Sequence, residues 1–138
     1  MPSVSTTLAT LQELVARLGR FDADAVAKLF AETIDWDVPG ATTVPWTGRR
    51  SKRHEVADYF LTLWSVCDTA QTDNTVHQVL LDGADAVALG TFAQTVRATG
   101  RRLTTPVAMH ITVDDGGLIT RLHLYEDSYA VAAAFNDA

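Results

Sequence analysis

Apolar residues recur at helical spacing in the first half of the chain and alternate with polar residues in the second half. The first run places five apolar side chains on one helical face: Leu8, Leu11, Leu14, Val15 and Leu18. Gly19 then ends the run, as glycine does at helix C-termini. Asp22 has the side chain of a helix cap and is expected to begin a second helix that runs to about residue 30. Together the two segments predict an αα-hairpin.

A short strand, a loop and a third helix are expected next. Residues 34–38 alternate apolar and acidic side chains before Pro39 and Gly40 break the chain, which is typical of a strand. Residues 41–50 are a loop that is long enough to edge a cavity. Ser51 can cap the helix that follows. The apolar stripe of that helix has helical spacing throughout: Val56, Tyr59, Phe60, Leu63, Trp64 and Cys67.

After residue 68 the pattern becomes that of β-strands. Four segments rich in Val, Thr, Ile and Leu are predicted as strands: 75–81, 85–98, 103–113 and 118–126. Glycine-containing turns separate them, so we expect consecutive antiparallel strands. Asp127 or Ser128 can then cap a terminal helix over residues 129–135.

This order predicts a single α+β domain over residues 1–138, in which three helices cover one face of an antiparallel sheet. A long, strongly curved sheet covered on its concave side leaves a cavity, because helices cannot fill a cone to its end. Concave, mostly apolar cavities are the usual sites for small molecules. We therefore expect an apolar small-molecule ligand between the sheet and the helices.

Composition narrows the class of partner. Eleven Lys and Arg against 17 Asp and Glu give a formal net charge of −6, which disfavours nucleic acid and anionic membrane surfaces. The basic run at residues 49–53 is interpreted as a solvated turn. Cys67 has no second cysteine to pair with and is interpreted as buried filler. Because neither a signal peptide nor a membrane-spanning stretch is recognisable, we expect a cytoplasmic protein.

Four features together carry a family resemblance. They are the segment 35–40 (Asp-Trp-Asp-Val-Pro-Gly), Gly48, the helix around Val56 and Phe60, and the ending Asp-Gly-Gly-Leu-Ile followed by Leu-Tyr-Glu-Asp-Ser. In these the chain resembles, over nearly its whole length, SnoaL-like proteins of the nuclear transport factor 2-like superfamily, which includes ketosteroid isomerases, limonene epoxide hydrolases and scytalone dehydratases. The resemblance implies a cone-shaped, cystatin-like roll. It also implies a homodimer that forms through the exposed face of the sheet.

The resemblance suggests Asp37 as a catalytic base. Asp37 falls where ketosteroid isomerases keep their general base, and desolvation beside Trp36 would raise the pKa of its carboxyl group. The alternative is a solvated aspartate on the polar face of a short strand, since Asp35 shares its parity. The isomerase's hydrogen-bond donors fall on Leu14 and Met109, which cannot donate to an enolate.

Two further residues are catalytic candidates. Related cyclases and epoxide hydrolases use an acid on the last strand, where this chain has Leu124; Glu126, two residues on and of the same parity, could take over. SnoaL-like cyclases often carry a polar residue near the place of His110. However, apolar Met109 and Ile111 define the buried parity of that strand, which points His110 the other way.

Substrate-binding candidates are residues that could line a pocket for a planar or polycyclic ligand, with plain core packing as the alternative. They are Trp36, Trp46, Tyr59, Trp64, Phe92, Gln94, Met109 and Leu124. Gln94 or His110 could orient the substrate or stabilise developing charge. No helical His-x-x-x-His spacing, phosphate loop or dinucleotide fingerprint is present, so we expect no metal and no cofactor.

Three functions are compatible with these features. The first is an enzyme that performs acid/base chemistry, such as isomerisation, cyclisation, dehydration or epoxide opening, on a polyketide- or terpenoid-like metabolite. The second is a module that binds such a molecule without converting it. The third is an association domain that acts through its sheet. An enzyme needs a carboxyl group with a perturbed pKa that faces the ligand, whereas a binding module needs only shape and apolar lining.

Overall fold

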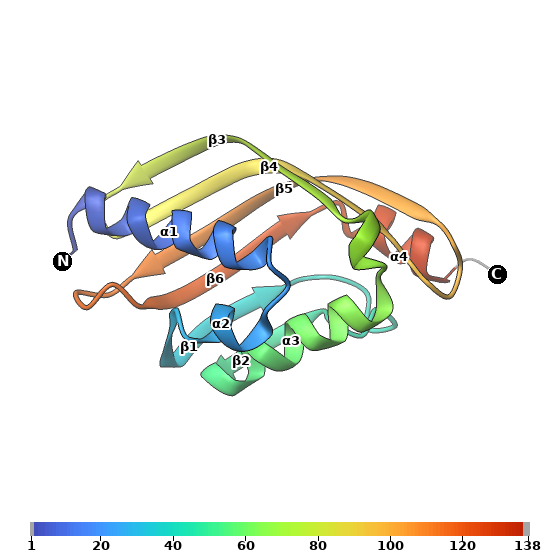
Figure 1. Ribbon diagram of the computed structural model, residues 1–138, viewed down its shortest axis with the longest axis horizontal. Helices are drawn as coiled ribbons and strands as arrows, with labels where there is room; N and C mark the ends of the chain where they lie inside the picture. Colours follow the sequence, from blue (N-terminus) through green and yellow to red (C-terminus); the bar gives the residue numbers. More distant parts are fainter. Residues whose placement is uncertain (1, 137–138) are drawn as a thin grey trace.

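The computed structural model describes residues 2–136, which form one curved sheet and the helices packed on it (Figure 1). Within these residues the strands are β1 (Phe30–Val38), β2 (Gly48–Lys52), β3 (Asp73–Asp82), β4 (Asp85–Thr95), β5 (Arg102–Val113) and β6 (Ile119–Glu126). The helices are α1 (Val4–Leu18), α2 (Ala23–Ala27), α3 (Arg53–Val66), the short 3-10 helix η1 (Thr69–Gln71) and α4 (Ser128–Asn136). The predicted α+β class and its four C-terminal strands are thereby confirmed.

The sheet is mixed rather than wholly antiparallel. Its strand order is β2-β1-β6-β5-β4-β3, and β3 to β6 form the predicted antiparallel run. β1 instead pairs in parallel with β6. The reason is the connection through β2 and α3, which carries the chain to the far edge of the sheet. The chain then returns strand by strand until β6 lies beside β1, in the same direction.

Three local expectations were wrong. The second helix ends at Ala27, and Phe30, expected at its end, begins β1 and is fully buried. The loop over residues 41–50 ends in an additional strand, β2, which lacks apolar alternation because it pairs only with β1 at the sheet edge. Ser51 belongs to β2 and does not cap α3; instead the Glu55 carboxylate accepts the backbone N–H groups of Ser51 and Lys52, at 3.1 and 3.0 Å.

Two predicted caps are present. The Asp22 carboxylate accepts the N–H of Ala25 at 3.0 Å and caps α2. Of the two residues that could cap α4, Asp127 does so, by accepting the N–H of Ala130 at 3.0 Å. Both caps satisfy donors that a helix N-terminus otherwise leaves unpaired.

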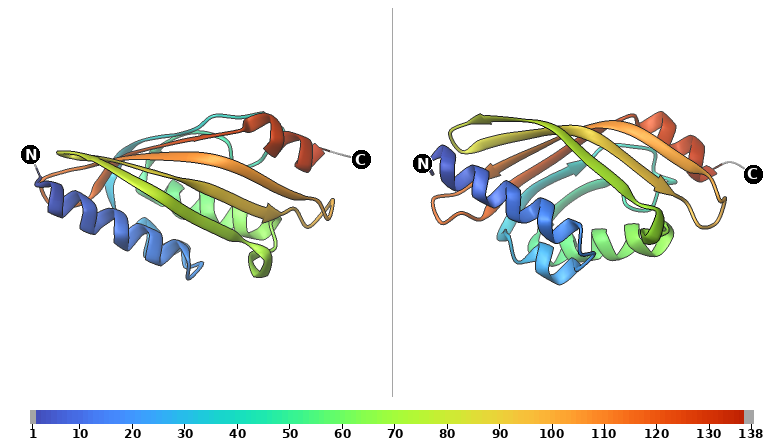
Figure 2. Two further views of the ribbon diagram at one scale, coloured as in Figure 1. Left: turned by 90° about the horizontal axis from the view of Figure 1, so that it is seen from above. Right: turned by 45° about the horizontal axis from the view of Figure 1, so that its top comes forward.

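The core lies on the concave face of the sheet, where α1, α2 and α3 pack (Figure 2). Trp36 of β1 is at its centre and is 1% exposed. Its ring makes edge contacts with Tyr59 and Phe60 of α3, at centroid distances of 4.8 and 6.0 Å. Register shifts in β1, β3 and at the end of the β5–β6 pair bend the sheet. α4 lies at the end of the sheet opposite the N-terminus of α1 (Figure 1).

Gly90 of β4 lies opposite the register shift in β3, between Val76 and Gln78. A Cβ atom on residue 90 would collide with the backbone carbonyl of Thr75, so β3 and β4 can approach only at a glycine. We expect Gly90→Ala to lower the free energy of unfolding by about 2 kcal/mol, as overpacking in a core does. Urea titration would measure this. Gly116→Ala, in an open turn, is the control; equal stability of both variants would contradict the steric role.

Candidate functional site

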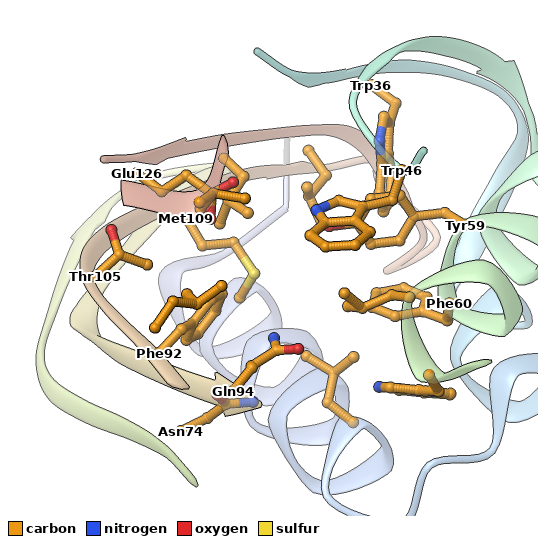
Figure 3. A pocket seen from close by; sticks show the side chains of 17 residues that line it. Trp36, Trp46, Tyr59, Phe60, Asn74, Phe92, Gln94, Thr105, Met109 and Glu126 are labelled. Carbon is orange, nitrogen blue, oxygen red and sulfur yellow. The ribbon is translucent and has the colours of Figure 1, made fainter. Parts of the chain in front are cut away.

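A cavity of ≈ 60 Å³ lies between the concave face of the sheet, the C-terminal end of α1, α3 and α4 (Figure 3). The eight predicted substrate-binding residues all line it: Trp36, Trp46, Tyr59, Trp64, Phe92, Gln94, Met109 and Leu124. Glu126, expected only as a catalytic residue, lines it too. The remaining lining residues were not predicted for the pocket: Leu18, Phe60, Leu63, Asn74, Leu103, Thr105, Leu122 and Val131. The wall is therefore mostly apolar and aromatic.

Among residues 2–136, Glu126 is the one residue with a carboxyl group that lines this cavity. It is the last residue of β6, and it shares the inward parity of Leu122 and Leu124. No hydrogen bond or ion pair joins its carboxyl group to another described residue. Burial raises the pKa of Glu126 from 4.5 to about 7, because the apolar surroundings disfavour the charged form.

Thr105 of β5 holds the backbone next to Glu126 in place by a hydrogen bond to Asp127. The Thr105 hydroxyl group donates to the carbonyl of Pro106 at 2.9 Å and accepts the N–H of Asp127 at 2.8 Å. Thr105 is fully buried. Because this contact holds the backbone directly after Glu126, it sets where β6 ends and α4 begins. Thr105 shares the inward parity of Leu103 and Met109, and this parity is the signal that would have identified it.

Tyr59 of α3 lies across the cavity from Glu126 (Figure 3). Burial, and then the nearby charge of Glu126, raise the pKa of the Tyr59 hydroxyl group well above its ordinary value. Tyr59 therefore remains a neutral hydrogen-bond donor at any physiological pH. The Arg50 guanidinium group lies over the Tyr59 ring, 5.0 Å from its centroid, and holds the ring in place by a cation–π contact.

Two buried polar atoms of the lining residues lack hydrogen-bond partners among the described residues. They are the indole nitrogen Nε1 of Trp36, a donor, and the amide oxygen Oε1 of Gln94, an acceptor. Trp36 is 1% exposed and Gln94 is 9% exposed. Leaving such atoms unpaired costs free energy, about 1–3 kcal/mol each. A bound molecule with a matching acceptor and donor would remove that cost.

Asp37 and His110, the other catalytic candidates, do not line the cavity; both lie on the convex face of the sheet. Asp37 is adjacent to inward-facing Trp36, so its own side chain points outward, where it pairs with Arg49 at 3.7 Å. His110 is hydrogen-bonded to Asp85 at 2.8 Å. Of the two alternatives for Asp37, a base that faces the pocket was therefore wrong, and an aspartate on the polar face of the strand agrees with the structure. The parity argument that points His110 away from the cavity agrees with it too.

The convex face carries hydrogen-bonded pairs of histidine and aspartate side chains. His123 is hydrogen-bonded to Asp35 at 2.9 Å and lies opposite His110 in the β5–β6 pair. The hydrogen bond from His123 lowers the pKa of Asp35, and hydrogen bonds from Thr112 and His110 lower that of Asp85. Within residues 2–136 no three His, Cys, Asp or Glu side chains are placed to hold a metal ion. Likewise, none of the described helices is long and apolar enough to cross a membrane.

A family model for the SnoaL-like domain matches residues 11–122. The chain belongs to the SnoaL-like family. The match includes most of the residues that line the cavity, while Leu124, Glu126 and α4 lie beyond its end. Among curated proteins no significant match is found.

Solved structures of the same fold are similar over nearly the whole chain. A nuclear transport factor 2-like protein from Burkholderia xenovorans is 22% identical, with a TM-score of 0.81 and 99% of both chains covered. A putative isomerase from Bacillus subtilis is 21% identical, with a TM-score of 0.78, covering 100% of this chain and 98% of that one. TerC, crystallised with polyporic acid, is 15% identical, with a TM-score of 0.82, covering 96% and 99%. At these identities the likeness shows the fold.

Proposed function

We propose that this SnoaL-like protein is an enzyme that moves a proton on an apolar small molecule, with Glu126 as the general acid/base. The observation that carries the proposal is a carboxyl group at the wall of a mostly apolar cavity, where no other described residue contributes a carboxyl group or hydrogen-bonds to it. Acid/base catalysis is most efficient when the pKa of the catalytic group lies near the working pH. With a pKa of about 7, Glu126 is populated in both protonation states at neutral pH.

The chemistry follows from the groups around Glu126. The carboxylate would accept a proton from a carbon next to a carbonyl group, and the resulting acid would return the proton to another atom of the same molecule. Negative charge then develops on the carbonyl oxygen. Tyr59 and the indole N–H of Trp36 are two of the donors in the lining that would stabilise it, and both residues are buried, where such hydrogen bonds are strongest.

The lining also supports a substrate class. Indole, phenol and phenyl rings form much of the wall, as is typical of sites for planar or polycyclic apolar ligands. Neighbours of the same fold include proteins described as putative isomerases and TerC crystallised with polyporic acid. We therefore favour a polyketide- or terpenoid-like metabolite and an isomerisation or cyclisation over hydrolysis.

A thermal-shift screen would find the ligand. Polyketide-like, steroid, terpenoid and epoxide compounds are tested on the wild-type protein, and hits are incubated with the protein in D2O. Proton transfer predicts that deuterium enters a C–H position of the ligand, as measured by mass spectrometry. Hits that bind but neither exchange a proton nor change would instead assign the cavity to a binding module.

We also propose a homodimer through the convex face of the sheet. Apolar side chains form a patch there across four strands, and the pairing register places them side by side: Leu80, Val87, Leu89, Ala108 and Tyr125. Leu80 and Tyr125 are 49% and 54% exposed. A second copy of the chain would cover them, since a two-fold contact pairs the same patch on both subunits.

Sedimentation velocity at micromolar concentration tests the dimer. We expect a dimer for the wild type and a monomer for Leu89→Glu, because the new charges at the centre of the patch would be buried against each other. Leu61→Glu is the matched control: Leu61 is 58% exposed, but it lies on α3. A monomeric wild type, or dissociation by both variants alike, would count against this interface.

A further inference from the structure

A second cavity, of ≈ 260 Å³, lies beside the one that contains Glu126. It is enclosed by the C-terminal half of α1 and the neighbouring parts of β3, β4 and β5. We name it the α1 chamber; the residues that line it alone are Val15, Gly19, Thr75, Val76, Ala88, Gly90 and Val107. Four further residues line both cavities: Leu18, Asn74, Phe92 and Met109. The two cavities are therefore neighbours with a common wall.

The two side-chain hydrogen bonds from α1 to the turns of the sheet lie in the N-terminal half of the helix. In the N-terminal half of α1, the Thr7 and Thr10 hydroxyl groups donate to the carbonyls of Gly83 and Gly117, at 2.8 and 2.9 Å. Farther along α1 the facing residues of β4 include Ala88 and Gly90, which are too small to fill the space beneath the helix. As a result a gap lined mainly by apolar side chains remains open.

The wall between the two cavities contains a movable side chain. Figure 3 shows Met109 pointing into the cavity near Phe92, with α1 behind them. Methionine has three rotatable side-chain bonds and adapts to its neighbours at little cost. Rotation of Met109 would join the two spaces without any change in the backbone. The mouth of the α1 chamber is apolar as well: Val15 and Val76 are 40% and 42% exposed there.

We infer that the binding site continues past Met109 into the α1 chamber and that the substrate has two parts. A polar, reacting head binds between Glu126, Tyr59 and Gln94, and an apolar tail occupies the α1 chamber. The inference rests on the proposed function for the identity of the head. The common wall of Leu18, Asn74, Phe92 and Met109 supports it, because a molecule bound at Glu126 would reach the α1 chamber through this wall.

A series of 4-alkylphenols, from methyl to hexyl, probes both parts at once. The phenol group offers a donor for Oε1 of Gln94, and the chain reports on the α1 chamber. Each methylene group that leaves water should tighten binding about fourfold. Isothermal titration calorimetry on the wild-type protein should therefore give a dissociation constant that falls steadily with chain length.

Two variants block the α1 chamber from different sides. Ala88→Phe fills it from the sheet, and Val15→Trp covers its mouth from the helix. Both variants should abolish the increase in affinity with alkyl chain length. They should leave the affinity for 4-methylphenol within about twofold of the wild-type value, since this small probe binds in the cavity that contains Glu126. Ala16→Trp, on the exposed face of α1, should keep the full gain. If Ala88→Phe does not fold, Val15→Trp decides alone.

Two results would overturn the two-part site. One is a wild-type protein that does not bind the series or gains nothing with chain length. The other is an affinity that increases equally with chain length in the wild type and in the two blocked variants. Failure of the proposed function looks different: Glu126→Gln would then still convert substrate, or no substrate would be converted at all, while the dependence of alkylphenol binding on chain length remained.

Discussion

Replacing Glu126 with glutamine should lower kcat at least about 100-fold on the substrate that the screen identifies, because removal of a general acid/base typically costs this much or more. The amide has nearly the shape of the carboxyl group, so KM should change little. Glutamine cannot take up or release a proton at neutral pH. Steady-state kinetics on purified wild type and Glu126→Gln would measure the difference.

Asp37→Asn is the matched control, since it makes the same chemical change on the other face of the sheet. Its kcat should stay within about twofold of the wild-type value, as is usual for surface substitutions away from the site. The opposite result, with activity lost in Asp37→Asn and kept in Glu126→Gln, would identify Asp37 as the catalytic base, as the family resemblance suggested. Loss in both variants would point to a general effect on the fold.

The pH profile separates the two possible roles of Glu126. If its carboxylate acts first, as a base, kcat/KM falls as the pH drops below about 7; if its acid form acts first, kcat/KM falls as the pH rises above that value. Tyr59 does not interfere, because its pKa is raised far out of this range. The inflection should be absent from the residual activity of Glu126→Gln.

The alternation of apolar residues made most of the sheet predictable. In β5 the buried residues recur with period two along the whole strand, and in β6 they do so from Leu122 onward, so the inward faces of these segments follow from the sequence. β2 could not, because an edge strand with one neighbour needs no buried face and its residues are Gly-Arg-Arg-Ser-Lys. The parallel pairing of β1 with β6 was equally hidden, since pairing partners depend on the whole path of the chain.

Parity also explains which site residues were found. Adjacent residues of a strand face opposite sides, so Trp36 and Asp37 cannot both face the cavity. The sequence contained this conflict, because Trp36 was a lining candidate and Asp37 a catalytic one. The same rule correctly predicted that Glu126 and Leu124, two residues apart on one strand, face the same side. Asn74 was missed because a polar residue that faces inward leaves no apolar signal, and only the register with β4 places it. Thr105 could have been found from its parity with Leu103 and Met109.

Lowering the pH toward 5 should stabilise the fold through Glu126. The folded protein holds the proton of this residue up to a pH of about 7, whereas the unfolded chain releases it near the ordinary glutamate pKa of 4.5. Between these values the folded state binds more protons, so the free energy of unfolding falls as the pH rises. This difference between the folded and unfolded pKa of Glu126 corresponds to a loss of about 3 kcal/mol in the free energy of unfolding by pH 8.

Urea titrations at several pH values, on the wild type and on Glu126→Gln, isolate this contribution. Other groups titrate as well, but they are shared by both proteins and cancel in the difference. The lowered pKa values of Asp35, Glu55 and Asp85 act in the opposite direction, and only below about pH 4.5, where these carboxylates become protonated. Glu126→Gln should therefore gain stability relative to the wild type as the pH rises from 5 to 8. A difference that does not change with pH would mean that Glu126 is ionised and solvated in the folded protein, and the acid/base proposal would lose its physical basis.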